Sequence, residues 1–339
     1  MPAPPWKLET GLASVIAKWS AEGAVRGCLT ADESLPARPP RYARLPEELD
    51  PGIARALRGM KIESLYDHQA KAIRAAIAGR HTVIATPTAS GKSLCFHLPV
   101  LDAIAKEPEA SAIYLYPTKA LSRDQEAGVH ELARAAELAV PAIVYDGDTP
   151  GDARRAARER TRILMTNPDM LHSGILPHHT SWARLLSKLR YVVVDELHTY
   201  RGVFGSHVAH VLARLARVAR FHGSDPTFIC ATATIGNPRQ HAARLIGATE
   251  DDIELVSESG APQGERKVLV YNPPIVNAEL GMRASYLKST VRLTKDLLRA
   301  RVPTIVFGPS RNSVALMLKY LRDALGGQIG EAVTRTYRV

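Results

Sequence analysis

TPTASGKS, residues 86–93, joins two segments of different character. The run before it, HTVIA (81–85), is apolar and β-branched, as in a buried strand, and the residues after it carry a helical pattern. A small-residue loop between a strand and a helix turns its backbone N–H groups inward, and the beginning of the helix adds partial positive charge. The sequence therefore predicts a phosphate-binding loop, and with it a nucleotide site.

The side chains of this loop suit the same chemistry. We expect Lys92 to reach the β- and γ-phosphates and the Ser93 hydroxyl to bind Mg²⁺. The remaining expected contacts to the nucleotide come from Thr88, Ala89, Ser90 and Gly91. One position departs from the strict pattern, because Thr86 stands where a glycine is usual. ATP with Mg²⁺ is the expected cofactor pair.

Two carboxylates follow a second apolar strand, in YVVVDELHTY (191–200). Asp195 stands at the carboxyl end of that strand, where it can hold Mg²⁺ through water. Glu196 is placed to orient or deprotonate an attacking water. An Asp-Glu pair after a strand is also common in solvated turns, so this prediction depends on the upstream loop. Together with Lys92, the two acids predict hydrolysis of a nucleoside triphosphate.

Short apolar runs alternate with helical stripes from about residue 60 to 256. Repeated strand–helix–strand units predict an α/β fold with a parallel sheet that is covered on both faces. Ligands of such sheets lie at the carboxyl ends of the strands. The strand-like runs are residues 81–85, 111–116, 141–145, 162–166, 191–195 and 227–232.

The chain divides by composition into four parts. Residues 1–54 combine a helical repeat of apolar residues, from Leu8 to Trp19, with a proline-rich arm. Residues 55–256 form the predicted nucleotide-binding domain, and the turn-rich stretch 257–265 reads as a linker. Residues 266–339 resemble the beginning of a second α/β domain, with strands over 267–272 and 304–308 and helices over about 283–300 and 311–325.

Charge and composition narrow the functional class. The 339 residues include 44 Lys and Arg against 34 acids, a net charge of +10. A polyanionic partner, most often nucleic acid, is as good an explanation as a generic basic surface. The beginning of the chain lacks signal-peptide order and no run approaches ~18 apolar residues. We therefore expect a cytoplasmic, nucleoid-associated protein without membrane contact.

The motifs occur in the order of a superfamily 2 helicase with a DExH box. LYDHQ (65–69) resembles the element that recognises adenine, and TPTASGKS resembles motif I. Downstream, PTKAL (117–121), TNPDM (166–170), DELH (195–198), TAT (232–234) and TIVFGPSRN (304–312) resemble motifs Ia, Ib, II, III and IV. The resemblance implies a complete RecA-like P-loop NTPase lobe, followed by a second RecA-like lobe that is truncated.

Finer features are similar to the bacterial mitomycin-repair-factor type, MrfA, a RecQ-like group. They are PTKALSRDQ, YDGDTP (145–150), TNPDMLH (166–172) and, above all, DELHTYRGVFGSHVA. This resemblance implies an ATP-dependent DNA helicase that moves 3′ to 5′ on single-stranded or tailed duplex DNA in DNA repair. It also implies a monomer with no small-molecule substrate other than ATP.

The resemblance also assigns roles to individual residues. Gln69 would read the adenine and Tyr66 would stack on it, while His198 would connect the γ-phosphate site to motif III. Thr232 and Thr234 would couple the nucleotide state to the grip on DNA. The expected nucleic-acid contacts are Thr118, Lys119, Thr166, Asn167, Tyr200 and Arg201, the last two by stacking on or wedging a base.

The sequence lacks motifs V and VI, which would supply an arginine to the γ-phosphate. We therefore expect an N-terminal piece of a helicase that binds ATP and nucleic acid and turns ATP over slowly by itself. Two alternatives stay open. One is an RNA-dependent ATPase of the same superfamily, and the other is a nucleic-acid-binding module without catalysis.

Overall fold

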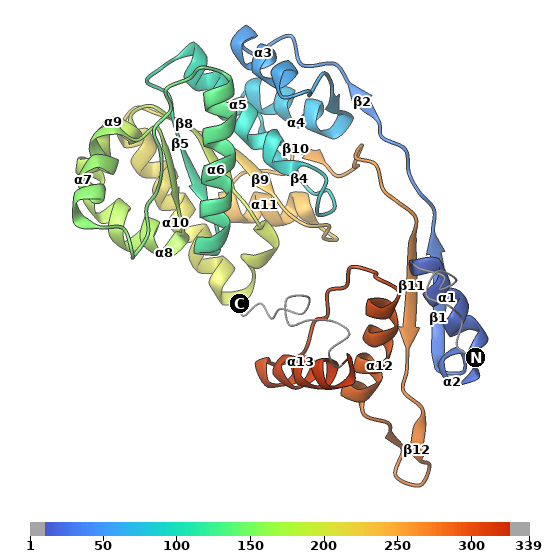
Figure 1. Cartoon of the computed structure of the whole chain (residues 1–339). Coiled ribbons are helices and arrows are strands. Elements are labelled where there is room, and N and C mark those ends of the chain that lie inside the picture. The colour runs from blue at the N-terminus through green and yellow to red at the C-terminus, as the bar shows by residue number, and fades with distance from the viewer. Residues whose placement is uncertain (1–10, 326–339) are drawn as a thin grey trace. The chain divides into compact units, whose positions relative to one another are not determined.

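The computed structural model describes residues 11–325, which form two compact units (Figure 1). The sheet unit comprises Arg38–Gln263, and the composite unit comprises the residues up to Ala37 together with those from Gly264 onward. These boundaries differ from the expected ones, because the N-terminal helix belongs with the C-terminal segment and the proline-rich arm is split between the units.

The sheet unit contains a seven-stranded parallel sheet in the order β10-β4-β9-β8-β5-β7-β6. All six strand predictions within the domain are confirmed, and β10 adds an edge strand. The phosphate loop follows β4 and the Asp-Glu pair follows β8. The strands are β4 His81–Ile84, β5 Ser111–Leu115, β6 Ala142–Val144, β7 Ile163–Thr166, β8 Leu189–Val194, β9 Thr227–Ala231 and β10 Ile253–Val256.

Helices cover both faces of this sheet, as the alternation in the strands requires. Ile84, Tyr114 and Val193 pack with α3, α4, α5 and α6 on one face. Val83, Leu115 and their neighbours pack with α7, α9, α10 and α11 on the other. The helices are α3 Pro51–Gly59, α4 Asp67–Ile77, α5 Lys92–Lys106, α6 Lys119–Ala135, α7 Gly151–Arg160, α8 Pro168–Met170, α9 Ala183–Leu186, α10 Gly202–Phe221 and α11 Pro238–Ile246.

Shorter elements connect this framework. β2 (Tyr42–Ala43) pairs with β3 (Leu65–Tyr66) in front of α4. A π-helical turn, Leu171–Ile175, runs into 3₁₀ turns over Leu176–Trp182, and another 3₁₀ turn spans Leu197–Thr199. No helix in the described range is both long and apolar enough to cross a membrane.

The composite unit joins segments from the two ends of the described chain. β1 (Leu29–Leu35) pairs antiparallel with β11 (Arg266–Tyr271). Val15 and Trp19 of the N-terminal helix pack against α12. Leu8, where the predicted helix begins, lies outside the described residues. The elements are α1 Leu12–Ala21, α2 Gly23–Arg26, β12 Ile275–Asn277, β13 Met282–Arg283, α12 Tyr286–Arg299 and α13 Arg311–Leu325.

The strand predicted over residues 304–308 is absent from the structure. The helices on either side, α12 and α13, lie where the sequence predicted them. Ile305 and Phe307 are 81% and 89% exposed, and no described strand pairs with their segment. A strand forms only when a neighbour completes its backbone hydrogen bonds, so the β-branched pattern alone was insufficient.

The predicted linker is held to the sheet unit by backbone hydrogen bonds. The Gln263 carbonyl accepts from Arg38 N at 2.8 Å, and Arg38 O accepts from Gln263 N at 3.0 Å. Arg41 N donates to Gly260 O at 2.8 Å. The segment is therefore an ordered strap as far as Gln263, where the unit boundary falls.

Candidate nucleotide and nucleic-acid site

The phosphate loop is closed by its own side chains. Thr86 Oγ1 and Ser90 Oγ are 2.7 Å apart and both residues are buried. Ala89 and Gly91 have φ angles of 62° and 76°, in the left-handed region. The threonine that departs from the strict motif thus provides a hydrogen bond across the loop that a glycine lacks.

Lys92 opens α5 and lies over the loop. Its Nζ donates to the carbonyls of Thr86 at 2.9 Å and Pro87 at 3.1 Å. Burial lowers the pKa of Lys92, and the carboxylates of Glu196 and Asp195 oppose this shift. The ammonium group therefore interacts electrostatically with the acidic pair after β8. The predicted phosphate and Mg²⁺ site requires these three charged groups to lie near one another.

Asp195 and Glu196 follow β8 in an unusual backbone conformation. Asp195 N donates to Leu115 O at 3.0 Å, and Asp195 Oδ1 accepts from Glu196 N at 2.8 Å. Glu196 has a φ angle of 50°, which is strained for a side chain of this kind. Burial raises the pKa of Asp195 to about 6, with the Glu196 charge adding to the shift. A buried carboxylate without full compensation suits a site for a divalent cation.

A chain of polar side chains joins motif II to motif III. His198 Nδ1 lies 3.2 Å from Glu196 Oε2 and 3.5 Å from Thr232 Oγ1. Thr232 is buried at the end of β9, which lies between β4 and β8 in the sheet. Thr234 is exposed. The structure thus brings Glu196, His198 and Thr232 into contact.

Gln69 lies beneath the phosphate loop. Its Oε1 accepts from Tyr66 N at 2.9 Å, and its Nε2 donates to Gly91 O at 2.9 Å. Tyr66 stacks between Tyr42 and His68, with ring centroids 5.5 Å and 5.9 Å away. The amide expected to read a base is therefore engaged with the backbone, and Tyr66 is the more accessible of the two.

His68 is a site residue that motif reasoning missed. Its Nδ1 accepts from Gly260 N at 3.1 Å, so the neutral ring carries its proton on Nε2 and donates to Ser90 O at 3.1 Å. Burial lowers its pKa, which favours this neutral form. One imidazole thus ties the phosphate loop to the strap, and only its position between Asp67 and Gln69 hinted at such a role.

Three of the predicted nucleic-acid residues remain available at the surface. Thr118 is exposed in front of α6, and Lys119 Nζ forms an ion pair with Asp148 Oδ2 at 2.5 Å. Hydrogen bonding to Asp148 raises the pKa of Lys119. Arg201 is exposed in front of α10.

Two other predicted contacts, Tyr200 and Thr166, are buried and need correction, whereas half-buried Asn167 stays a prediction. Tyr200 is fully buried and packs near Phe204, so its ring cannot stack on a base in this structure. Thr166 is buried and its hydroxyl donates to Tyr145 O at 2.7 Å. Asn167 Oδ1 caps α8 by accepting from Met170 N at 2.8 Å. Close to Tyr200, it is Phe204, 44% exposed, that presents an aromatic surface to solvent.

A parallel α/β sheet with a phosphate loop after one central strand and an Asp-Glu pair after another defines a RecA-like P-loop protein. The profile of the DEAD/DEAH box helicases matches residues 66–242, and the chain belongs to this family.

Individual relatives make the similarity closer. The chain is 46% identical over 302 residues to the uncharacterized ATP-dependent helicase YprA of Bacillus subtilis (strain 168). That match covers 88% of this chain and 40% of YprA. The crystal structure of the DUF1998 helicase MrfA bound to DNA has a TM-score of 0.88 and 42% identity, over 93% of this chain and 41% of MrfA.

A second crystal structure holds MrfA bound to DNA and AMPPNP. Its TM-score is 0.87 at 42% identity, over 92% of this chain and 43% of MrfA. The predicted similarity to the mitomycin-repair-factor type is thereby confirmed. The chain spans about two fifths of the length of these relatives.

Proposed function

We propose that this chain is the nucleotide-binding part of an ATP-dependent DNA helicase that moves 3′ to 5′ in DNA repair, in the cytoplasm and as a monomer. The observation that carries the proposal is the convergence of Lys92, Asp195 and Glu196 at the carboxyl edge of the sheet, after β4 and β8, with His198 joining Glu196 to Thr232 at the end of β9 between them. The ATP-analogue and DNA complexes of MrfA support the same ligands for this chain.

The residues of the loop fit a nucleoside triphosphate with Mg²⁺. A Cβ at Gly91 would lie 2.6 Å from Gln69 Nε2, so glycine at this position lets the loop pack directly on the adenine-recognition element. With a nucleotide bound, Lys92 would exchange the loop carbonyls for β- and γ-phosphate oxygens, while Ser93 and Asp195 would hold the metal, Asp195 through water. When bound, Mg²⁺ would neutralise part of the negative charge of the phosphates. Glu196 positions the attacking water and accepts its proton.

Coupling to nucleic acid runs through Thr232. His198 sits between the water-positioning Glu196 and the end of β9, so a change at the γ-phosphate alters the hydrogen bond at motif III. Thr118, Lys119 and Arg201 would hold the sugar-phosphate backbone without reading sequence. Phe204 replaces Tyr200 as the stacking residue of this face.

The test is reciprocal binding of AMPPNP with Mg²⁺ and a 20-nucleotide oligothymidylate. AMPPNP is expected to tighten oligothymidylate binding, and the oligonucleotide must tighten AMPPNP binding by the same factor. Lys92→Ala should abolish AMPPNP binding, whereas the exposed control Lys188→Ala should leave it unchanged. Thr232→Ala should keep both affinities and lose the coupling. AMPPNP binding that survives Lys92→Ala would contradict the proposal.

Two further outcomes would replace this function with the alternatives. Coupling to oligouridylate but not to oligothymidylate would indicate an RNA-dependent ATPase. Oligonucleotide binding that depends on salt and ignores AMPPNP would indicate a binding module without catalysis.

A further inference from the structure

A line of four cations runs along α12 of the composite unit. Lys288, Arg292, Lys295 and Arg299 are spaced by four, three and four residues, so they share one side of the helix. They extend over about 16 Å at the helical rise of 1.5 Å per residue. We name these four residues the basic stripe.

Both other sides of α12 are occupied by packing. Leu293 and Leu297 contact the cluster around Trp19, and Leu287 and Val291 contact Met317 of α13. Asp296 is buried, where it accepts from Lys18 Nζ at 2.6 Å and Trp19 Nε1 at 3.0 Å. The only acid of α12 is thus engaged with α1, and the basic stripe occupies the side that packing leaves to solvent.

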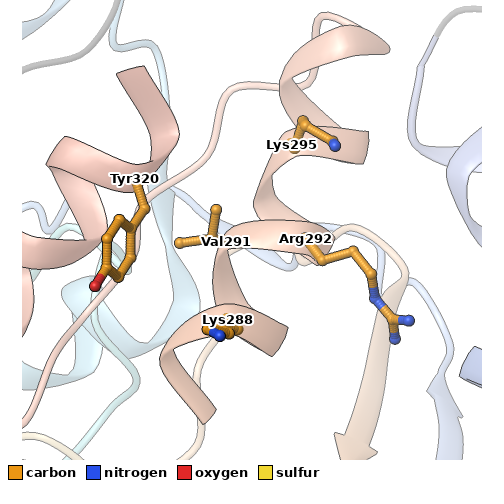
Figure 2. Close-up of a pocket in the computed structure, with 5 residues that line it drawn as sticks. All are labelled: Lys288, Val291, Arg292, Lys295 and Tyr320. Atoms are coloured by element: carbon orange, nitrogen blue, oxygen red, sulfur yellow. The ribbon is translucent and has the colours of Figure 1, made fainter. Parts of the chain in front are cut away.

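The stripe borders an open groove between α12 and α13. The cavity has a volume of about 340 Å³ and is lined by Lys288, Val291, Arg292, Lys295 and Tyr320. Figure 2 shows Tyr320 across from Val291, with Lys288 and Lys295 on α12. Tyr320 is 39% exposed, so cations and an aromatic surface lie together.

The cations of this groove are open to an anion. Among residues 11–325, no carboxylate forms an ion pair with Lys288, Lys295 or Arg299. Arg292 is held in place, because its Nη2 donates to Tyr271 Oη at 2.8 Å and its guanidinium lies 5.8 Å from the Tyr271 ring centroid. Arg292 Nε is buried without a hydrogen-bond partner in the same range. On α13, Lys319 precedes Tyr320.

We propose that the basic stripe and Tyr320 form a second nucleic-acid contact, separate from the helicase motifs. The cations hold the phosphate backbone of a single strand along the length of the basic stripe, and one unpaired base stacks on Tyr320. Single-stranded nucleic acid is favoured over other polyanions because Tyr320 and Val291 add an apolar surface to the charge. The inference rests on the proposed function and adds a partner surface to it.

The experiment measures binding of fluorescent 20-nucleotide oligothymidylate to the whole chain at salt concentrations from about 0.05 to about 0.3 M. Phosphate contacts dominate the salt dependence of binding over roughly this range. Each lost phosphate contact lowers the slope of log affinity against log salt by about 0.7. Lys288→Ala with Lys295→Ala should therefore reduce the slope by about 1.4 and weaken binding about 25-fold at 0.1 M salt. Arg55→Ala with Arg58→Ala, on exposed positions of α3, is the charge-matched control and should do neither.

Tyr320 variants separate stacking from charge. Tyr320→Ala should weaken oligothymidylate binding at least about fivefold with an unchanged salt slope, and Tyr320→Phe should restore it. Equal effects of the stripe and control variants would overturn the proposal, as would equal competition by polyglutamate. AMPPNP binding is measured in parallel. If wild-type protein binds AMPPNP but no oligonucleotide, the proposed function fails as well, whereas wild-type-like binding by the stripe variants overturns the second contact alone.

Discussion

Replacement of Gly91 by alanine tests how the adenine-recognition element supports the phosphate loop. Gly91 has a φ angle of 76°, and a Cβ there would lie 2.6 Å from Gln69 Nε2. Gln69 cannot easily move away, because it is buried and its Oε1 accepts from Tyr66 N. The substitution therefore adds backbone strain and also breaks the bond from Gln69 Nε2 to Gly91 O.

These two effects have separate magnitudes. A left-handed alanine costs about 1–2 kcal/mol, and the lost hydrogen bond costs about 1 kcal/mol more. Gly79 supplies a matched control, because its φ angle is 80° and a Cβ there meets nothing within 4 Å. Gly79→Ala should therefore cost only the strain, and Gly91→Ala should exceed it by about 1 kcal/mol.

The assay is hydrogen exchange of the β4 and β9 amides, which reports the opening free energy of the sheet unit. In a Gln69→Ala background the excess cost of Gly91→Ala should disappear, since the two residues are then no longer coupled. AMPPNP binding should weaken about fivefold in Gly91→Ala, because about 1 kcal/mol reduces the population of the competent loop by that factor. Gly79→Ala should leave AMPPNP binding unchanged.

Equal losses in Gly91→Ala and Gly79→Ala would refute the reasoning, because the contact with Gln69 would then contribute nothing. An excess that persists without the Gln69 side chain would refute it in another way. The strain would then belong to the loop itself, and Gln69 would be a bystander.

Substitutions at three further residues test a buried histidine, a buried tyrosine and a strained backbone. Burial lowers the pKa of His97 to about 4, so folded His97 stays neutral while the unfolded chain gains a proton as pH falls below 6.5. Through this residue, the free energy of unfolding of wild-type protein should fall by about 2 kcal/mol between pH 7 and 5. In urea titrations the His97→Gln variant should lack that fall, and an equal fall in the variant would contradict the prediction. Tyr200→Phe should lower the free energy of unfolding by under about 0.5 kcal/mol, because the Tyr200 hydroxyl is buried without a hydrogen-bond partner in the described range. Tyr200→Ala should lower it by about 3–5 kcal/mol. Thermal unfolding measures both, and a large loss of stability in Tyr200→Phe would indicate a hydrogen-bond partner for this hydroxyl. Glu196→Gly should raise the free energy of unfolding by about 1 kcal/mol, because glycine adopts the left-handed φ of this position without strain. The same variant should abolish ATP hydrolysis. A variant less stable than wild type would contradict the strain assigned to Glu196.

The sequence predicted the sheet unit well because its signals are local. Each buried parallel strand is a short apolar run, and a helix with one apolar stripe follows, so the positions of β4, β8 and α10 could be read without long-range information. The carboxyl ends of those strands necessarily meet at one edge. Lys92 and Asp195 could therefore be assigned to one site before their electrostatic interaction was known.

Where a side chain points could not be predicted in the same way. Tyr200 and Arg201 are neighbours in the sequence, yet one is fully buried and the other exposed, because the turn before α10 sends them in opposite directions. Thr166 is the last residue of β7, and its hydroxyl donates a hydrogen bond to Tyr145 O in the neighbouring segment. Motif order assigns a residue to a region, whereas packing decides whether its side chain is free.

The pairing of β1 with β11 has a consequence for synthesis of the protein. Thr30 and Val270, which contact each other across these strands, are 240 residues apart. At about 5–20 residues per second, β1 waits roughly ten to fifty seconds for its partner to leave the ribosome. The whole sheet unit is made within that interval and can fold first. Until β11 arrives, the backbone N–H and C=O groups along the pairing edge of β1 have no strand partner, although Asp32 and Glu33 keep this edge charged.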